Sequence, residues 1–249
     1  MEESERPTHV RPRHRMIDRV AAILEAVARS DGLSLTEIAR KVEAPVSSVQ
    51  GLVNGLVASG YLDERARTYR LGVAPYFLNL LAGRGAVNRI VHDDLVELHA
   101  ETDSTTVVLG VAVGPDVVYI DHCSTDPRTE YLAKRFFRRS LIRTSTGWVL
   151  LADWEQRDLW AYLETLDPED EDRADQFLAR LEEIRESGVA TLPGAAEDAE
   201  VDGISVPVLE RGRVVAAVGV VGPREVLLPR QREIVAALHE HSTRWHARD

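Results

Sequence analysis

Cysteine is nearly absent from this chain of 249 residues, and the only one is Cys123. A single thiol forms neither an internal disulfide nor a zinc site of several cysteines, so we expect a reducing, cytoplasmic compartment. No run of about 18 uncharged apolar residues occurs, and the first fifteen residues, MEESERPTHVRPRHR, are charged throughout. We therefore expect neither a membrane span nor a signal peptide.

The short motifs that mark many catalytic folds are also missing. The chain contains no G-x-S-x-G, no G-x-x-x-x-G-K-[ST] and no G-x-G-x-x-G, which position catalytic serines, phosphates and dinucleotides. His122 and Cys123, with Asp121 and Asp126 close by, leave a metal site or a Cys–His pair as a weaker alternative. Adjacent strand residues point to opposite faces, so these side chains converge only if the strand bends. We expect no enzymatic activity, no cofactor and no bound metal.

Positive charge is scarce but unevenly spread. The chain has 30 basic and 41 acidic residues, a formal charge of -11. Residues 1–75 carry a net +1 and residues 76–249 a net -12, and residues 11–70 alone carry +3. Such a difference in net charge indicates a small module suited to binding nucleic acid and a larger module that is not. The alternative is chance variation of charge on solvated faces.

Residues 14–75 have the pattern of three helices and a hairpin. Apolar residues recur at helical spacing from Ile17 to Val27, and Asp31-Gly32 supplies turn chemistry. Ser34 and Glu37 form a capping-box pattern at the start of a second helix. A third helix is predicted from about Pro45 to Ser59, because proline is tolerated in a first helical turn.

The third helix has an unusual outward face. At 100° per residue its apolar residues share one side, whereas the opposite side carries small or amide-bearing residues, among them Ser47, Gln50, Gly51, Asn54 and Ala58. Gln and Asn each pair with adenine in the major groove, and small neighbours allow close approach to base edges. The pattern predicts a helix-turn-helix that reads DNA through Ser47, Ser48, Gln50, Gly51 and Asn54.

Residues 61–71 predict a hairpin whose tip carries Arg65 and Arg67, which makes the helix-turn-helix winged. Arginines at a wing tip reach phosphates or the minor groove. The third helix itself offers no cation, so the electrostatic attraction has to come from Arg19, Arg40, Lys41, the wing and the N-terminal arm. The alternative is a small helical domain with an incidental charged turn.

The second part of the chain alternates helical and strand patterns. Hairpins are predicted at Gly114-Pro115 and at residues 210–213, residues 130–137 are a further strand candidate, and a closing helix is predicted at 229–246. Helices at the ends of an antiparallel sheet define an α+β domain.

In order and spacing, the chain resembles the isocitrate-lyase-regulator (IclR) family of bacterial transcription regulators. The resemblance rests on RVAAILEAVA, LSLTEIARKV, PVSSVQGLVNGLVASGYL, YRLG, VVYID, TSTGWVLLA, ISVPV and VVAAVGVVGP, which together run from residue 19 to residue 223. It implies a winged helix-turn-helix at 14–75, a linker helix and hinge at 76–86, and a GAF-like, effector-binding α+β domain at 87–248. It also implies dimers or tetramers on a double-stranded operator.

The resemblance further implies where a small-molecule effector binds, and this chain departs from it there. Members place pocket residues where this chain has Ser145, Thr146, Gly147, Gly203 and Gly219, but they carry cysteine at the position of Gly203, often serines at Gly219 and Val221, and lysine at Trp148. The recognition helix also lacks the family's usual cations at Val46 and Gly51.

Two questions stay open at this point. Arg143 is a candidate partner for a carboxylate effector, since guanidinium matches carboxylate bidentately, and the alternative is a surface arginine. The chain is expected to be an effector-controlled regulator, with repression the favoured mode and an organic acid or aromatic metabolite the favoured effector. The alternative is a sensing or protein-interaction module of the same family with weakened DNA binding.

Overall fold

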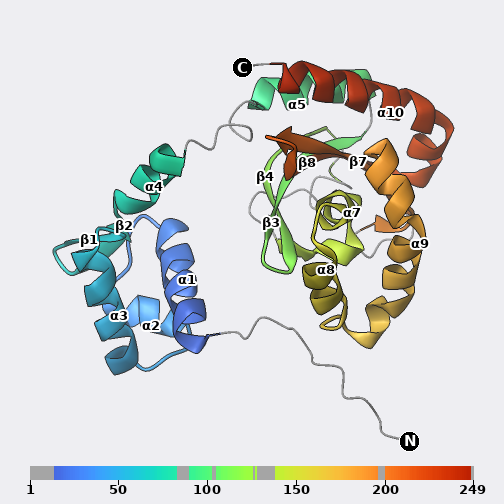
Figure 1. Ribbon diagram of the computed structural model, residues 1–249. Coiled ribbons are helices and arrows are strands. Elements are labelled where there is room, and N and C mark those ends of the chain that lie inside the picture. The colour runs from blue at the N-terminus through green and yellow to red at the C-terminus, as the bar shows by residue number, and fades with distance from the viewer. Residues whose placement is uncertain are drawn as a thin grey trace, which may run out of the picture. The chain divides into compact units, whose positions relative to one another are not determined.

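The computed structural model describes residues 14–82, 90–102, 105–125, 127, 138–195 and 200–247. The chain divides near residue 84 into an N-terminal unit, Arg11–Arg84, and a C-terminal unit that begins at Gly85 (Figure 1). This division lies inside the segment predicted as a linker. In the described residues no helix is both long and apolar enough to span a bilayer.

The N-terminal unit is a winged helix-turn-helix, as predicted. Its elements are α1 (Arg15–Ala28), α2 (Leu35–Lys41), α3 (Val46–Ala58), β1 (Leu62–Arg65), β2 (Thr68–Leu71) and α4 (Ala74–Ala82). The predicted capping box is present at the start of α2, where Ser34 Oγ accepts from the Glu37 amide and the Glu37 carboxylate accepts from the Ser34 amide. These bonds, together with nearby Arg40 and Lys41, lower the pKa of Glu37.

A short backbone bridge that the sequence did not predict holds the wing against the helices. Leu33 and Tyr69 exchange both backbone hydrogen bonds, at 3.0 and 2.8 Å. Arg70 Nε on β2 also donates to the carbonyl of Asp31 at 2.7 Å. The loop between α1 and α2 therefore acts as a third strand beside the wing and fixes its base.

The C-terminal unit is an α+β domain, which confirms the predicted fold class. Its antiparallel sheet has the order β5-β4-β3-β8-β7-β6. Its strands are β3 (Thr106–Val113), β4 (Asp116–Ser124), β5 (Arg138–Ser140), β6 (Ala190–Leu192), β7 (Val201–Glu210) and β8 (Arg213–Pro223). Its helices are α5 (His92–Thr102), η3 (Leu141–Arg143), α7 (Ser145–Ala152), α8 (Gln156–Leu163), η4 (Pro168–Asp170), α9 (Glu171–Ser187) and α10 (Arg224–His246).

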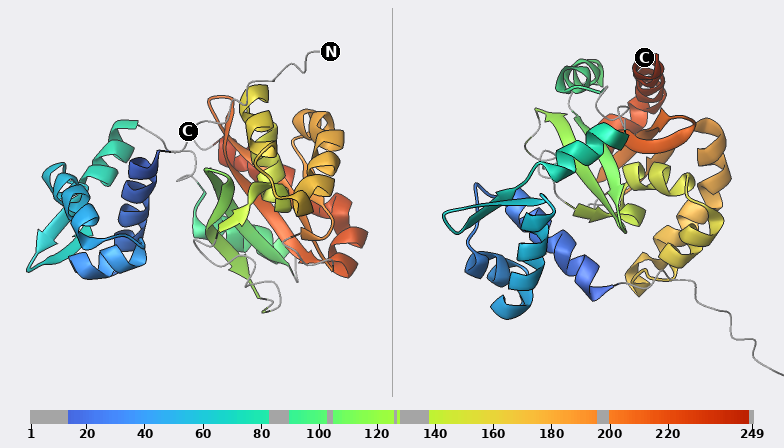
Figure 2. Two further views of the ribbon diagram at one scale, coloured as in Figure 1. Left: turned by 90° about the horizontal axis from the view of Figure 1, so that it is seen from below. Right: turned by 60° about the vertical axis from the view of Figure 1, so that its left-hand side comes forward.

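Helices cover both faces of this sheet, not only its ends as the sequence analysis expected (Figures 1 and 2). Along β3, Val107 and Leu109 pack into the core beneath α5 and α10, whereas Val108 packs into the core beneath α7, α8 and α9. Strands that are apolar at successive positions are typical of sheets buried on both faces. The run VVAAVGVV of β8 has this pattern.

One helix boundary differs from the prediction, and two elements were not predicted. Helix α10 begins at Arg224, with Pro229 inside it, because the burial of Leu227 against the sheet outweighs the hydrogen bond that proline removes. Helix α8 and strand β6 were not predicted, since both are short. The strand expected at residues 130–137 lies outside the described residues.

The exposed glycines of α3 provide a test of this fold. A Cβ added at Gly51 would meet nothing within 4 Å, so Gly51→Ala should stabilise α3 by about 1 kcal/mol and slow exchange of its amide protons about fivefold. Hydrogen–deuterium exchange of the α3 amides measures this. Gly203→Ala is the matched control, because its Cβ would lie 2.5 Å from Ser145 Oγ and should destabilise the C-terminal unit. Faster exchange in Gly51→Ala would contradict the exposed position of Gly51.

Candidate functional site

The exposed face of α3 is the first candidate site. Val49, Val53 and Leu56 are buried against the helices of the N-terminal unit, whereas Ser47, Ser48, Gln50, Gly51 and Asn54 are all exposed. The helix thus has the two opposite faces that its sequence pattern predicted. The exposed face of α3 thus presents two hydroxyl groups, two side-chain amides and one glycine, and none of these five residues is charged.

The turn before α3 sets how this face is presented. Helix α2 ends at Lys41, and Glu43 adopts a left-handed φ of 49° before α3 begins at Val46. The Ala44 amide donates to the carbonyl of Ala39 at 3.0 Å, which closes the turn. Arg40 and Lys41 are exposed at the end of α2, on the chain segment that leads directly into α3.

The wing carries its two arginines at the tip, as predicted. Arg65 pairs with Thr68 in the ladder, so Ala66 and Arg67 form a two-residue turn with φ of 49° and 62°. Such turns favour Asn and Gly, and alanine and arginine adopt this conformation at a cost. Arg65 Nε lies 3.1 Å from Asp63 Oδ2, and its side chain is 86 % exposed. Arg19, in contrast, is half-buried on α1.

The predicted effector residues fall into two separate groups in the C-terminal unit. Ser145, Thr146 and Gly147 begin α7; Ser145 lies against Gly203 of β7, Thr146 against Gly219 of β8, and Gly147 against Leu141. Ser205 Oγ lies 2.8 Å from Ser145 Oγ and 3.3 Å from Thr146 Oγ1. We call Ser145, Thr146 and Ser205 the hydroxyl cluster; all three side chains are buried.

The hydroxyl cluster is close-packed. A Cβ at Gly219 would lie 2.5 Å from Ser205 Oγ and 3.0 Å from Thr146 Oγ1, and a Cβ at Gly147 would overlap the carbonyl of Leu141. Burial raises the pKa of Tyr119, whose hydroxyl interacts with Thr146 and Thr144, so this phenol stays protonated. The glycines therefore allow helix and sheet to approach each other, and they leave no open volume at their own positions.

Trp148 explains one departure from the family pattern. Its side chain is fully buried, its indole Nε1 donates to the carbonyl of Ile142 at 2.8 Å, and its ring meets Phe177 of α9 edge-on at 5.6 Å. The guanidinium of Arg180 lies 5.9 Å from the Trp148 ring centre. In place of a lysine, this position thus carries a core residue that joins α7 to α9.

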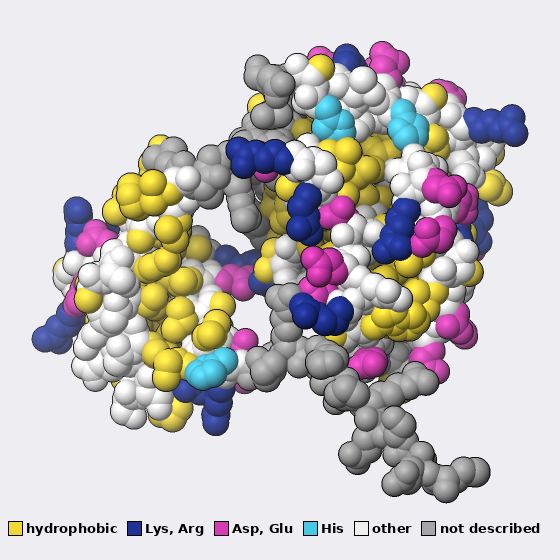
Figure 3. Space-filling model, in the orientation of Figure 1, with side chains coloured by type: hydrophobic (Ala, Val, Ile, Leu, Met, Phe, Trp, Pro, Cys, Tyr) yellow, Lys and Arg dark blue, Asp and Glu magenta, His cyan; other side chains and the backbone are white. Residues whose placement is uncertain are grey.

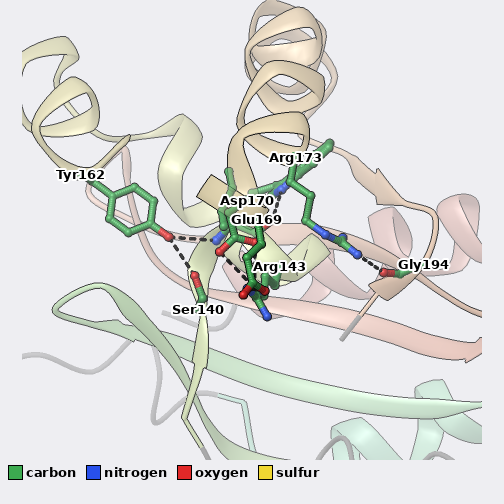
Figure 4. Close-up of polar contacts among 9 residues, drawn as sticks. Ser140, Arg143, Tyr162, Glu169, Asp170, Arg173 and Gly194 are labelled. Atoms are coloured by element: carbon green, nitrogen blue, oxygen red, sulfur yellow. Dashed lines mark hydrogen bonds and ion pairs between the residues drawn. The ribbon is translucent and has the colours of Figure 1, made fainter. Parts of the chain in front are cut away.

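Arg143 forms the second group, and Figure 4 shows it beside Asp170 and Glu169. Its Nε donates to both carboxylate oxygens of Asp170, at 2.7 and 3.0 Å, and its Nη2 lies 3.5 Å from Glu169 Oε2. Asp170 is only 4 % exposed. Arg143 is therefore a half-buried arginine paired with an internal carboxylate, a role between the two alternatives that the sequence left open.

Arg143 also lines a cavity with a volume of about 470 Å³. The Tyr162 hydroxyl at its wall accepts from the Ile142 amide at 3.0 Å and lies 3.2 Å from Ser140 Oγ. Burial raises the pKa of this phenol, so it stays protonated. Sequence analysis did not single out Tyr162, because its distance along the chain from Arg143 hides their proximity.

The structure describes His122 and Cys123 of β4 together with Asp121, whereas Asp126 lies outside the described residues. His92 Nδ1 lies 3.2 Å from Asp121 Oδ1, and burial together with Asp121 raises the pKa of the Cys123 thiol. His122 Nδ1 is buried without a hydrogen-bond partner. Among the described residues, no three His, Cys, Asp or Glu side chains are placed to hold one ion.

Comparison with known proteins shows how this architecture is related to others. Residues 16–66 match the model of the IclR helix-turn-helix domain, and residues 83–245 match that of the bacterial transcriptional regulator IclR C-terminal domain. The HTH-type transcriptional regulator BhcR of Paracoccus denitrificans (strain Pd 1222) is 28 % identical over 149 residues, which cover 58 % of this chain and 53 % of BhcR. The match thus spans about half the length of that relative.

Solved structures share the fold over nearly the whole chain. An IclR homologue from Microbacterium hydrocarbonoxydans, solved with 4-hydroxybenzoate, has a TM-score of 0.65 at 22 % identity and covers 92 % of this chain and 96 % of its own. An IclR-type regulator from Silicibacter sp. TM1040 has a TM-score of 0.68 at 24 % identity, with 92 % and 94 % covered. Since the two family models together match most of the chain, the protein belongs to the IclR family of bacterial transcriptional regulators.

Proposed function

We propose that this protein is a cytoplasmic, DNA-binding transcriptional repressor. In this proposal its affinity for a double-stranded operator changes when a small molecule binds the C-terminal unit. The observation that carries the proposal is the exposed, uncharged, hydrogen-bonding face of α3 beside a cationic turn and wing. Such a face suits the base edges of the major groove, whereas a solvated helix ordinarily carries Glu and Lys.

In this proposal the two kinds of residue have separate tasks. Gln50 and Asn54 read adenine, and Ser47, Ser48 and Gly51 let α3 approach the bases. The basic residues contact phosphates or the minor groove and set the affinity for DNA of any sequence. They are Arg19, Arg40, Lys41, Arg65 and Arg67.

In this proposal the C-terminal unit binds the small molecule that controls DNA binding. Its excess of carboxylates disfavours contact with DNA, and it contains a cavity of a size that suits small organic molecules. The relative solved with 4-hydroxybenzoate supports an aromatic or other organic acid as the effector class.

Self-association is part of the proposal. The N-terminal unit exposes several large apolar side chains on α1, on α4 and on the segment before α4 (yellow in Figure 3). These are Met16, Ile17, Leu71, Val73, Tyr76, Phe77, Leu78 and Leu81, with exposed fractions between 44 % and 70 %. Exposed apolar surface of this extent marks an interface, so we propose that two copies pair here as a dimer, alone or within a tetramer.

A second candidate function is a sensor or protein-interaction module that has lost tight DNA binding. It is favoured by the absence of any cation from the described exposed face of α3. Binding of the purified protein to DNA from upstream of its own gene and its neighbours, with salt varied and scrambled competitor present, separates the two. Sequence-specific binding supports the regulator, and its absence from a folded dimer at low salt supports the sensor.

Gln50→Ala tests base recognition. Loss of a bidentate contact should cost about 1 to 3 kcal/mol on the specific operator and leave non-specific binding unchanged. Fluorescence anisotropy with operator and scrambled duplexes measures both. Gln176→Ala, an exposed glutamine-to-alanine change on α9, is the matched control. Equal weakening on the two duplexes would rule out base reading by Gln50.

Arg67→Gly tests the wing. Glycine adopts the φ of 62° found at this position without cost, so the change removes a cation and keeps the turn. Affinity for all duplexes should fall, and the slope of log K against log salt should become shallower by about 1. Ala66→Gly is the matched control, because it changes the same turn to glycine but retains the Arg67 cation, and it should leave the salt slope unaltered. An unaltered slope in Arg67→Gly would mean that the wing tip does not contact phosphate.

Phe77→Glu tests the apolar interface. Phe77 is 55 % exposed, so a charge there should leave the fold intact but oppose pairing. Light scattering after gel filtration should show a lower mass for Phe77→Glu, and operator affinity should fall with it. Trp160→Glu places a charge on the exposed surface of α8, where Trp160 is 46 % exposed, and should keep the wild-type mass. An unchanged mass in Phe77→Glu would place the self-association surface elsewhere.

A further inference from the structure

Helix α3 is uncharged along its whole length, and this limits which bases it can recognise. Its 13 residues, VSSVQGLVNGLVA, include neither Arg nor Lys, and neither Asp nor Glu. Arg and Lys are the usual side chains that pair with guanine O6 and N7, and Glu and Asp accept from the cytosine amino group. The side chains that best recognise a G·C pair are therefore missing from this helix.

Three exposed side chains of α3 form one row. Val46, Gln50 and Asn54 follow one another at intervals of four residues, so each lies about one turn after the last and is rotated by about 40°. All three are exposed. Gln and Asn each combine a donor with an acceptor and bind adenine at N6 and N7. The row therefore begins with a valine and continues with two amides suited to adenine.

Val46 occupies an unusual place for an apolar residue. It is the first residue of α3 and is 41 % exposed, whereas Val49 and Val53 of the same helix are fully buried. The residues near the N-terminus of a recognition helix are those that reach base edges. Thymine presents a methyl group in the major groove, and apolar side chains recognise it by contact. Val46 thus has the position and the chemistry to meet a thymine methyl group.

Gly51 and Gly55 lie one turn apart beside this row. A Cβ added at either position would meet nothing within 4 Å, so the packing of the N-terminal unit does not require glycine there. Glycine nevertheless lowers the stability of a helix relative to alanine. A helix surface without side chains at these positions allows an outside molecule to approach closely. Side chains as short as those of Val46 and Asn54 can then reach base edges.

We propose that α3 recognises A·T base pairs, with Gln50 and Asn54 bound to adenine and Val46 in contact with the 5-methyl group of thymine. The row then uses both halves of an A·T pair, the amino group and N7 of adenine and the methyl group of thymine. This inference rests on the proposed function, because it specifies the base chemistry of the operator and adds Val46 as a residue that determines specificity.

Base analogues test the proposal on duplexes that the full-length chain selects from a random library. Uracil in place of thymine removes only the 5-methyl group, and binding should weaken about fourfold for each methyl group in contact. Substitution by 7-deazaadenine removes the N7 acceptor of adenine and should weaken binding about fivefold per contact. Substitution by 7-deazaguanine removes the same acceptor from guanine and should leave the affinity unchanged. Fluorescence anisotropy measures the affinity for each duplex.

Val46→Ala tests which residue makes the methyl contact. Alanine is a good helix former and the position is exposed, so α3 should fold as in the wild type. The variant should bind the thymine duplex about fourfold more weakly, and it should bind the uracil duplex as tightly as the thymine duplex. Val96→Ala is the matched control, because Val96 is 43 % exposed on α5 of the other unit. It should keep both the wild-type affinity and the uracil effect.

Each outcome supports or overturns the proposal. A uracil effect that is present in the wild type and absent from Val46→Ala supports the thymine contact. An equal uracil effect in the two proteins, or none in the wild type, overturns it. Weaker binding with 7-deazaguanine, or unchanged binding with 7-deazaadenine, overturns recognition of A·T pairs by α3. If the folded protein enriches no sequence at all, the proposed function fails and this inference with it, which is distinct from a selected duplex that does not respond to the analogues.

Discussion

Helix α7 lies against the sheet of the C-terminal unit with all eight of its residues buried, and the rest of that unit is arranged around this contact. So close an approach requires residues without side chains beneath the helix, and Gly110, Gly203 and Gly219 provide them. The first turn of α7 then places Ser145 and Thr146 over Ser205, whose hydroxyl bonds to both of theirs. On its other side, Trp148 ties the helix to α9.

This packing has a consequence for ligand binding. A position where the family resemblance places effector contacts is filled here by close contacts between helix and sheet. The polar groups of Arg143 and Tyr162 lie elsewhere, at the end of η3 and at the end of α8, and both residues line one cavity. Trp148 packs in the core between α7 and α9, and Arg143 places a cation at the edge of that core.

The N-terminal unit divides its surfaces in a comparable way. One face of α3 is held in the core by Val49, Val53 and Leu56, which leaves Gln50 and Asn54 on the outside with no freedom to turn inward. The bridge between Leu33 and Tyr69 fixes the base of the wing. At its tip, Ala66 and Arg67 adopt the left-handed conformation that glycine and asparagine adopt more readily. Uncharged groups suited to bases and cations suited to phosphates are thus carried by different elements.

The sequence alone determined those features that depend on local chemistry and periodicity. The capping box at Ser34, the two faces of α3 and the wing hairpin follow from hydrogen bonding and side-chain spacing within about 15 residues. Only the tertiary structure decided which residues distant in sequence meet. Asp170 reaches Arg143 across 27 positions of the chain, Tyr162 reaches Ile142 across 20, and Ser205 reaches Ser145 across 60. No local pattern encodes such contacts, because they arise from the burial of both faces of one sheet and from the order of its strands.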